Sequence, residues 1–410
     1  MGEPSEQPAH NGLLSKARLL RPWQIRASRA EAVMDAFQEF LPAGDEAGEE
    51  EAARFLATLN PQSHVGARHH TVPRFLLERW GDRSSQVQTY SRIEEQFRIR
   101  NIRDLAIKDF YTFIDLEGRK DSSMEVILSE GVERPAAAVL RGLLNPFVAP
   151  RPADVSDLAA LAQFAAFQVV RTARHRREGE LHAEWYAKTM AQGRISDARL
   201  REIVVTPHQN DSIRTMGDTA FKFTALLACR PVALVLLDRP RLLIGDDPVL
   251  VNPGPEDQTH VADCFLTDAQ ISARMARARR TKKGRRRRKI GRVVHFSSTV
   301  PRGLGVALEI ILPVSPRAAL LWGPLHDTPY VGDIVRERLD EAESERFADL
   351  ANDAMCVQAL DWVVSTATDE QFRDRAFPPM GPLMRVCDGV NAASAALNET
   401  PQRLRPARLW

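Results

Sequence analysis

The sequence predicts an α+β fold with a mainly helical body, a small meander of strands near its front, and a C-terminal mixed or antiparallel sheet. Helical periodicity dominates between residues 122 and 229, whereas segments rich in β-branched and aliphatic residues follow Pro231. A helical block followed by a strand block favours α+β over an alternating βαβ arrangement. The 410 residues, 44% of them hydrophobic, are enough for one large or two ordinary domains with a sizeable core.

The helical body is predicted from capping signals and from apolar spacing. Ser122 and Glu125 have the spacing of a capping box, which opens a helix that Pro135 kinks or divides before about Leu144. The segment from Asp154 to Arg176 is the longest and most apolar predicted helix. Further helices are expected at about 181–203, 211–229 and 339–363.

The strands are predicted in two groups. Near the front, residues 73–80 form a short helix and are followed by strands at 86–91 and 97–102 that pair. A further short extended stretch at 109–113 completes a small meander. After Pro231, strands of one sheet are expected at 232–237, 241–245, 292–300 and 305–313.

These elements divide the chain into three parts. Residues 1–62 form a helical N-terminal extension, and residues 63–366 form the main domain, with a basic insertion at about 253–292. Residues 367–410 form a tail without periodicity.

The charge of the insertion differs from that of the rest of the chain. Arg277 to Arg292 contains 11 Lys or Arg in 16 residues, whereas the remainder has 45 basic against 54 acidic residues, a net charge of −9. Such a block suits sequence-independent binding of nucleic acid through phosphates, with Arg285, Arg286, Arg287 and Arg288 as candidate contacts. The alternative is a solvated insertion that binds nothing.

Several classes of protein are disfavoured. The longest aliphatic run, Val232 to Leu237, is too short to span a bilayer, so we expect a cytoplasmic protein without a membrane partner. The four cysteines are scattered, and no histidine pair has zinc-binding spacing. Zinc, nucleotide and flavin motifs are absent, and the scarcity of lysine relative to arginine suggests a bacterial genome.

Several short motifs occur in a fixed order over residues 69–365. They comprise His70, Val72, Pro73, Arg74, Phe75 and Leu77; Lys108 to Thr112; Glu125 and Glu133; Gln168, Arg171 and Thr172; Gly245 to Val249; Leu312 to Pro316; and Asn352. With these motifs the chain resembles the bacterial domain-of-unknown-function family 4238. Asp247 departs from the Asn or similar polar residue usual there, Ala173 replaces a common proline, and the basic insertion is additional. The resemblance implies a domain but no established activity.

The predicted long helix carries a polar stripe formed by Gln168, Arg171 and His175 at i, i+3 and i+7. In one interpretation these residues bind substrate, and Arg171 clamps a phosphate or carboxylate. In the other, Arg171 forms a structural ion pair with Glu125 or Glu133.

The turn of Asp246 and Asp247 follows an apolar strand, a position where sites are often built. Paired carboxylates there suit Mg²⁺ or Mn²⁺, with His70, Glu125 and Asp246 as catalytic candidates. The alternative is ordinary Asp-Pro turn chemistry for the two aspartates and a packing role for His70.

Two functions therefore stay open at the level of sequence. The first is a metal-dependent hydrolase that acts on a phosphate-containing substrate such as nucleic acid. The second is a non-catalytic binding or sensor protein in which the same polar residues form a structural network. Both require the front motif, the long helix and the Asp-Pro turn to meet in space, because polar residues in apolar elements need shared partners.

Overall fold

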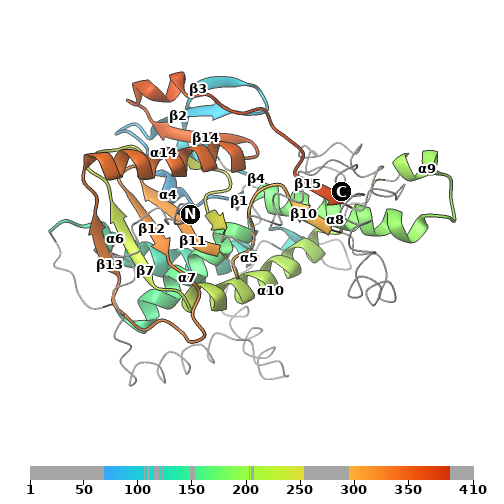
Figure 1. Ribbon diagram of the computed structural model, residues 1–410, viewed down its shortest axis with the longest axis horizontal. Helices are drawn as coiled ribbons and strands as arrows, with labels where there is room; N and C mark the ends of the chain where they lie inside the picture. Colours follow the sequence, from blue (N-terminus) through green and yellow to red (C-terminus); the bar gives the residue numbers. More distant parts are fainter. Residues whose placement is uncertain are drawn as a thin grey trace, which may run out of the picture.

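The computed structural model describes residues 69–253 and 295–387, apart from short gaps at 106, 109–110, 115–119, 122, 148–152, 203, 205–206 and 306. This part of the chain confirms the predicted α+β fold, with sheets and helices in separate layers (Figure 1). The predicted N-terminal extension, the basic insertion beyond residue 253 and the tail beyond residue 387 lie outside the described residues. Among the described helices, none has both the length and the hydropathy that a membrane crossing requires.

The larger sheet has five strands and is mixed, which is one of the two arrangements that the sequence predicted. β13 and β7 are parallel, whereas the other neighbouring strands are antiparallel. In spatial order the strands are β13 (Val335–Arg338), β7 (Val232–Leu236), β12 (Ala318–Trp322), β11 (Ala307–Ser315) and β9 (Leu250–Pro253).

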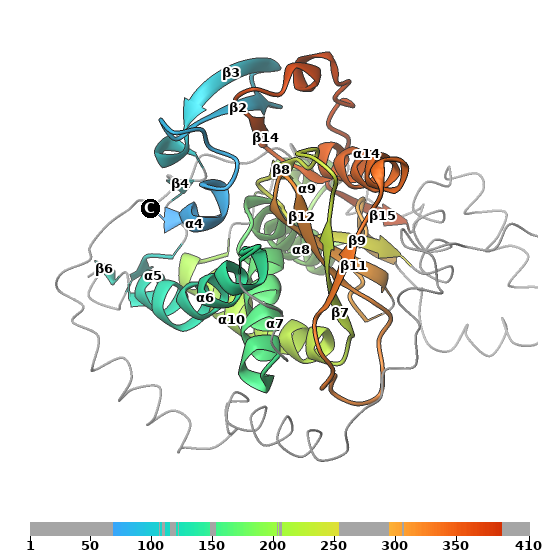
Figure 2. The same cartoon turned by 90° about the vertical axis from the view of Figure 1, so that its left-hand side faces the viewer.

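This sheet is buried on both faces because alternate side chains point to opposite sides. On β7, Val232 and Leu234 belong to the core that also contains the apolar residues of the long helices. Ala233 and Val235 belong to a second core, together with Phe347 and other residues of α14 (Glu341–Gln358). The sheet therefore lies between α14 and the helical body (Figure 2).

The predicted pairing of the first two front strands is confirmed, but they are part of a second sheet that the third predicted stretch does not join. β2 (Gln86–Ser91) pairs with β3 (Gln96–Asn101) in the expected antiparallel register. β14 (Trp362–Thr366) then pairs with β2, and β8 (Ile244–Gly245) pairs with β14. The prediction that residues 241–245 join one sheet with the other late strands was therefore wrong, as was the helix expected to continue to residue 363.

The helical body contains six α-helices and a π-helical segment among the described residues. α10 (Gln209–Ala228) packs along α7 (Val155–Val170), which begins with a capping box between Asp154 and Asp157. The others are α5 (Ser123–Ile127), η3 (Leu128–Glu133), α6 (Arg134–Leu144), α8 (Ala173–Ala191) and α9 (Asp197–Glu202).

Pro135 explains the division of the helix that it was predicted to kink. Proline has no N–H group and its ring clashes with the carbonyl one turn earlier, so the preceding turn widens. The six residues of η3 are π-helical, and the Arg134 N–H bonds to the Ser129 carbonyl five residues back. This widened segment ends at Glu133, which takes part in the candidate site.

Short elements complete the described fold. The predicted strand at 292–300 forms β10 (His295–Ser298), but the prediction that it joins the same sheet as the other late strands was wrong. It pairs with β15 (Met384–Cys387), in the tail where no periodicity was found. The remaining elements are β1 (His69–His70) paired with β4 (Ile107–Lys108), β5 (Phe113–Ile114) paired with β6 (Lys120–Asp121), α4 (Arg74–Leu77), η2 (Ile102–Asp104) and η4 (Glu370–Asp374).

At Gly245 on β8, α14 and the second sheet approach each other closely. A Cβ atom there would lie 2.9 Å from the Met355 sulfur and 3.3 Å from the Trp362 carbonyl oxygen. We expect Gly245→Ala to destabilise the fold by about 1–3 kcal/mol through overpacking. Gly142→Ala on α6, where nothing lies within 4 Å, should instead stabilise it by about 0.5–1 kcal/mol. Urea unfolding of both variants tests this, and equal effects would contradict the close contact.

Candidate functional site

The predicted long helix is broken at Arg171 and Thr172, and this break organises the polar residues of the site. Arg171 caps the end of α7, and Thr172 adopts an extended backbone conformation with φ −77° and ψ 152°. The Thr172 hydroxyl accepts a hydrogen bond of 3.1 Å from the His175 N–H and so caps α8. The predicted stripe of Gln168, Arg171 and His175 on one helix was therefore wrong, because His175 belongs to the next helix.

Arg171 lies at the centre of the first charge cluster, which we define as Tyr111, Glu125, Glu133 and Arg171. Its Nε donates to the Thr71 carbonyl at 2.7 Å, Nη1 to the Glu133 carboxylate at 2.7 Å, and Nη2 to the His70 carbonyl at 2.6 Å. The Arg171 side chain is 1% exposed. Arg171 thus forms the structural ion pair with Glu133 that was the second interpretation of this residue. Its contacts join the front motif to η3.

Glu125 and Tyr111 complete the first charge cluster. Burial raises the pKa of Glu125 to about 7, even though the Arg171 guanidinium and a hydrogen bond from the His70 backbone oppose this. Burial likewise raises the pKa of Tyr111, whose hydroxyl donates to the Arg171 carbonyl at 2.9 Å. Two of the candidate catalytic residues, His70 and Glu125, therefore lie together, with Glu125 half-buried and poised to change its charge near neutral pH.

The second charge cluster consists of Arg174, Glu178, Asp247 and Arg302. Arg302 donates to both Asp247 carboxylate oxygens, at 3.2 and 2.5 Å, and its Nε lies 3.4 Å from Glu178. Arg174 donates to Glu178 at 3.0 Å. The four side chains are between 0% and 17% exposed, so their charges compensate one another away from solvent.

The second charge cluster fixes α8 against three distant segments. Arg174 also donates to the Gln358 carbonyl at the end of α14, at 2.8 Å. The Glu178 carboxylate accepts a 2.7 Å hydrogen bond from the Ser298 hydroxyl on β10.

Burial, together with the nearby Arg302, lowers the pKa of His175 to about 4, although Glu178 opposes the shift. The imidazole of His175 is therefore neutral at physiological pH.

Asp246 does not share the partners of Asp247. Its two carboxylate oxygens accept the backbone N–H groups of Leu360 and Asp361, at 2.9 and 2.8 Å, just before β14. Burial and the neighbouring Asp361 raise the pKa of Asp246 to about 7. The described residues contain no group of three or more His, Cys, Asp or Glu side chains placed to hold a metal ion. The contacts of Asp246 and Asp247 thus favour a structural role. This role is to join distant segments of the chain, whereas the alternative raised by the sequence was a local Asp-Pro turn.

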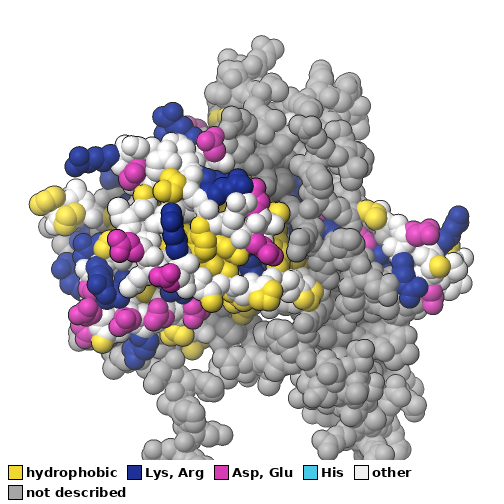
Figure 3. Space-filling view, turned by 90° about the horizontal axis from the view of Figure 1, so that it is seen from above, with side chains coloured by type: hydrophobic (Ala, Val, Ile, Leu, Met, Phe, Trp, Pro, Cys, Tyr) yellow, Lys and Arg dark blue, Asp and Glu magenta, His cyan; other side chains and the backbone are white. Residues whose placement is uncertain are grey.

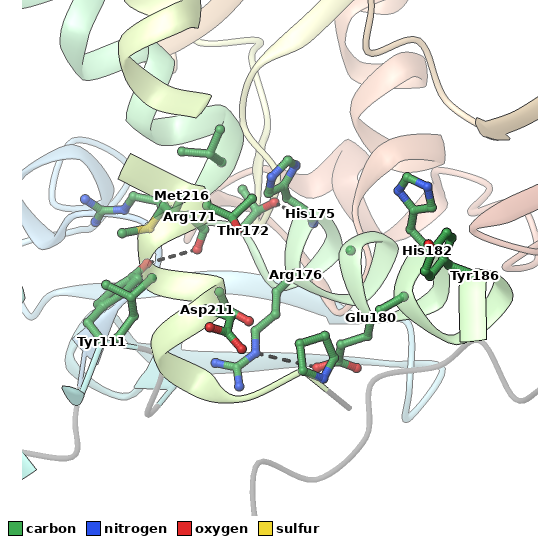
Figure 4. A pocket seen from close by; sticks show the side chains of 17 residues that line it. Tyr111, Arg171, Thr172, His175, Arg176, Glu180, His182, Tyr186, Asp211 and Met216 are labelled. Atoms are coloured by element: carbon green, nitrogen blue, oxygen red, sulfur yellow. Dashed lines mark hydrogen bonds and ion pairs between the residues drawn. The ribbon is translucent and has the colours of Figure 1, made fainter. Parts of the chain in front are cut away.

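A cavity of about 410 Å³ lies beside the break between α7 and α8 (Figure 4). Its walls are formed by α8 between Thr172 and Tyr186 and by α10 between Asp211 and Met216, with Tyr111 between them. The side-chain amide of Gln209, at the start of α10, donates to the Thr112 carbonyl at 2.7 Å. This bond holds α10 beside the segment that supplies Tyr111.

The cavity contains some of the predicted site residues and excludes others. Arg171 and His175 line it, whereas His70, Glu125, Gln168, Asp246 and Asp247 do not. Gln168 is fully buried on α7, and its amide makes no hydrogen bond within the part of the chain that the structure describes. Arg285, Arg286, Arg287 and Arg288 lie outside the described residues.

Sequence analysis missed the polar residues that α8 and α10 contribute to the cavity. Arg176, Glu180 and Asp211 all line it, and each is a charged residue on a helix that also has exposed positions. Such residues have no distinguishing local pattern. The only available signal was the capping threonine, which places Arg176 on a separate helix.

Glu125 should make stability dependent on pH. The carboxyl ionises near 4.5 in the unfolded chain and near 7 in the folded one, so its contribution is complete below pH 4.5 and is lost as pH rises through 7. Glu125→Gln stays uncharged, and its unfolding free energy relative to the unmodified protein should rise over this interval by on the order of 2 kcal/mol.

The measurement is denaturant unfolding of both proteins at pH 4.5 and pH 8. Glu95→Gln, at an exposed turn position, is the control and should not change the pH profile. A constant difference between Glu125→Gln and the unmodified protein at the two pH values would contradict the assignment.

Comparison with known proteins identifies one family. No curated protein and no solved structure matches the chain. Residues 68–271 match a family described as protein of unknown function (DUF4238). The match covers the motifs from His70 to Val249 and ends before those at Leu312 to Pro316 and at Asn352, whose assignment stays a prediction. The resemblance inferred from the sequence is confirmed, and residues 68–271 of this chain belong to the DUF4238 family.

Proposed function

We propose that this protein is a non-catalytic binding protein that takes a small molecule into the cavity between α8 and α10. The observation that carries the proposal is the cavity itself, about 410 Å³ in volume, beside a rigidly held helix break in the family region. This volume falls within the usual range of small-molecule sites, which are concave and mostly apolar with a few polar groups. The walls combine apolar residues such as Val170, Ile213 and Met216 with charged residues at one side.

The contacts of the charged motif residues support a structural role for them. Arg171, Asp246 and Asp247 each use their charged groups on protein partners, and all three are 3% exposed or less. Buried polar groups that are satisfied by protein partners keep the elements they join in one arrangement. In this proposal Arg171 helps to shape the wall of the cavity, the two aspartates hold the surrounding segments in place, and none of the three reacts.

A metal-dependent phosphate hydrolase, the other function raised by the sequence, receives less support. For Asp247 to bind Mg²⁺ or Mn²⁺ it would have to leave Arg302, which would then be a buried cation facing Glu178 alone. Asp246 would also have to release the two N–H groups that it accepts. Ligand binding in the cavity requires no such rearrangement, so the cavity is the better supported site.

Binding of nucleic acid through Arg277–Arg292 stays a prediction from charge, because that segment lies outside the described residues. On the described surface over α14 and the second sheet, basic and acidic side chains are interspersed (Figure 3). This face therefore does not by itself resemble a phosphate-binding surface, which needs clustered cations.

Gly179 allows a direct test of the cavity, because it lines the cavity and nothing lies within 4 Å of a Cβ built on it. Gly179→Trp should fill the space without disturbing the core and should abolish ligand-induced shifts in melting temperature. Gly179→Ala, the matched control, should keep these shifts and stabilise α8 by about 0.5–1 kcal/mol.

The assay is thermal unfolding with a panel of amino acids, aromatic acids, aliphatic amines, nucleosides and sugar phosphates. We expect at least one class to raise the melting temperature of the unmodified protein and of Gly179→Ala, but not of Gly179→Trp. Shifts that survive in Gly179→Trp, or a panel without any effect, would contradict the proposal.

A further inference from the structure

Charged residues on the wall of the cavity have opposite charges of the protein close to them. The Arg171 guanidinium lies 2.7 Å from the Glu133 carboxylate, and the Arg171 side chain is 1% exposed. On α8, the Glu180 carboxylate lies 3.6 Å from the Nε atom of Arg176 and 2.8 Å from the Nη1 atom of Arg177. Because two arginines share this one carboxylate, their charges are balanced only if a second acid lies near.

Asp211 supplies a second negative charge on the same side of the cavity. It lies in the first turn of α10, where the positive end of the helix dipole stabilises a carboxylate, and it is exposed to solvent. Figure 4 shows Arg176, Glu180 and Asp211 together in the lower part of the pocket. Arg176 and Arg177 are thus matched by two carboxylates, and the four side chains together carry no net charge.

The His175 imidazole, which also lines the cavity, is uncharged at neutral pH. Burial lowers its pKa to about 4, and the nearby Arg302 acts in the same direction, although Glu178 opposes the shift. Burial and Arg302 disfavour a ligand cation at this position for the same reason that they disfavour the protonated imidazole. This part of the wall therefore favours a ligand group without charge.

Apolar side chains from three helices form much of the remaining wall. Val170 ends α7, Ala183 lies on α8, and Ile213 and Met216 lie on α10, with the Tyr111 ring between the helices. Ile213 and Met216 are each 5% exposed, and Tyr111 is 2% exposed. Side chains of this kind bind an apolar surface because its removal from water is favourable.

We propose that the cavity binds an uncharged molecule with a mostly apolar surface, of the kind exemplified by an aromatic alcohol. The observation that carries the inference is the balance of the wall charges among themselves beside a buried apolar surface. A charged ligand would give up its hydration for a wall that offers it no opposite net charge. This inference rests on the proposed function, because it names the class of molecule that the cavity accepts.

Three matched indole compounds that differ in charge at neutral pH provide the test. Tryptophol is uncharged, indole-3-acetate carries a carboxylate, and tryptamine carries an ammonium group. In isothermal titration we expect tryptophol to bind about tenfold or more tightly than either charged compound. Tryptophol also joins the panel of the thermal unfolding assay, where Gly179→Trp should abolish its effect on the melting temperature.

Glu180→Gln tests whether the charges of the wall are balanced. Loss of this carboxylate leaves an excess of positive charge at Arg176 and Arg177. The affinity for indole-3-acetate, divided by that for tryptophol, should therefore rise by about fivefold or more. Glu95→Gln, at an exposed turn position outside the cavity wall, is the matched control and should leave this ratio unchanged. An unchanged ratio in a folded Glu180→Gln protein would contradict the inference.

The outcomes distinguish this inference from the proposed function. If either charged compound binds as tightly as tryptophol, or if tryptophol does not bind, the inference is wrong, and this comparison needs only the unmodified protein. If another compound of the panel then raises the melting temperature in a manner that Gly179→Trp abolishes, the cavity is still a ligand site. If no compound does so, both proposals fail.

Discussion

The rest of the described structure depends on one constraint: the positive charges of two buried arginines, Arg171 and Arg174, must be compensated. They lie on either side of the break between α7 and α8, and each must find negative partners away from solvent. Arg171 finds Glu133 and the carbonyls of the front motif, and Arg174 finds Glu178 and the end of α14. The break in the helix allows the two side chains to reach different segments.

These contacts define geometry more than they add stability. Buried ion pairs contribute little net free energy, but loss of one partner leaves an uncompensated charge and is costly. The pair of Asp247 and Arg302 joins positions 55 residues apart, before and after the basic insertion. Because closing a longer loop costs little additional entropy, this tie holds the two flanking segments in place largely irrespective of the length between them.

Local patterns in the sequence predicted the elements whose cause is local. The meander of β2 and β3 follows from alternation, and the division before α6 follows from Pro135. The break at Thr172 was missed because the apolar spacing continues across it, although threonine is a good helix cap and the family commonly has proline at the next position. The signal was present but weaker than the periodicity.

Features that depend on distant segments could not be predicted in the same way. Residues 362–366 form β14 because β2 and β8 lie on either side of them, and no local pattern records those neighbours. Asp246 was singled out from the sequence as a candidate catalytic and metal-binding residue, but its partners in the structure are N–H groups more than 110 residues later. The cavity arises where α8 and α10 approach each other, so its residues have no shared motif.

The unfolding free energy of Arg171→Ala tests the central claim most directly. If Arg171 is a structural ion pair, its loss leaves Glu133 and two buried carbonyls without their donor and destabilises the protein by about 3–5 kcal/mol. Arg74→Ala, which removes an exposed pair with Glu78, should cost less than about 1 kcal/mol. An Arg171→Ala protein as stable as the unmodified one would contradict the account and would favour Arg171 as a ligand clamp.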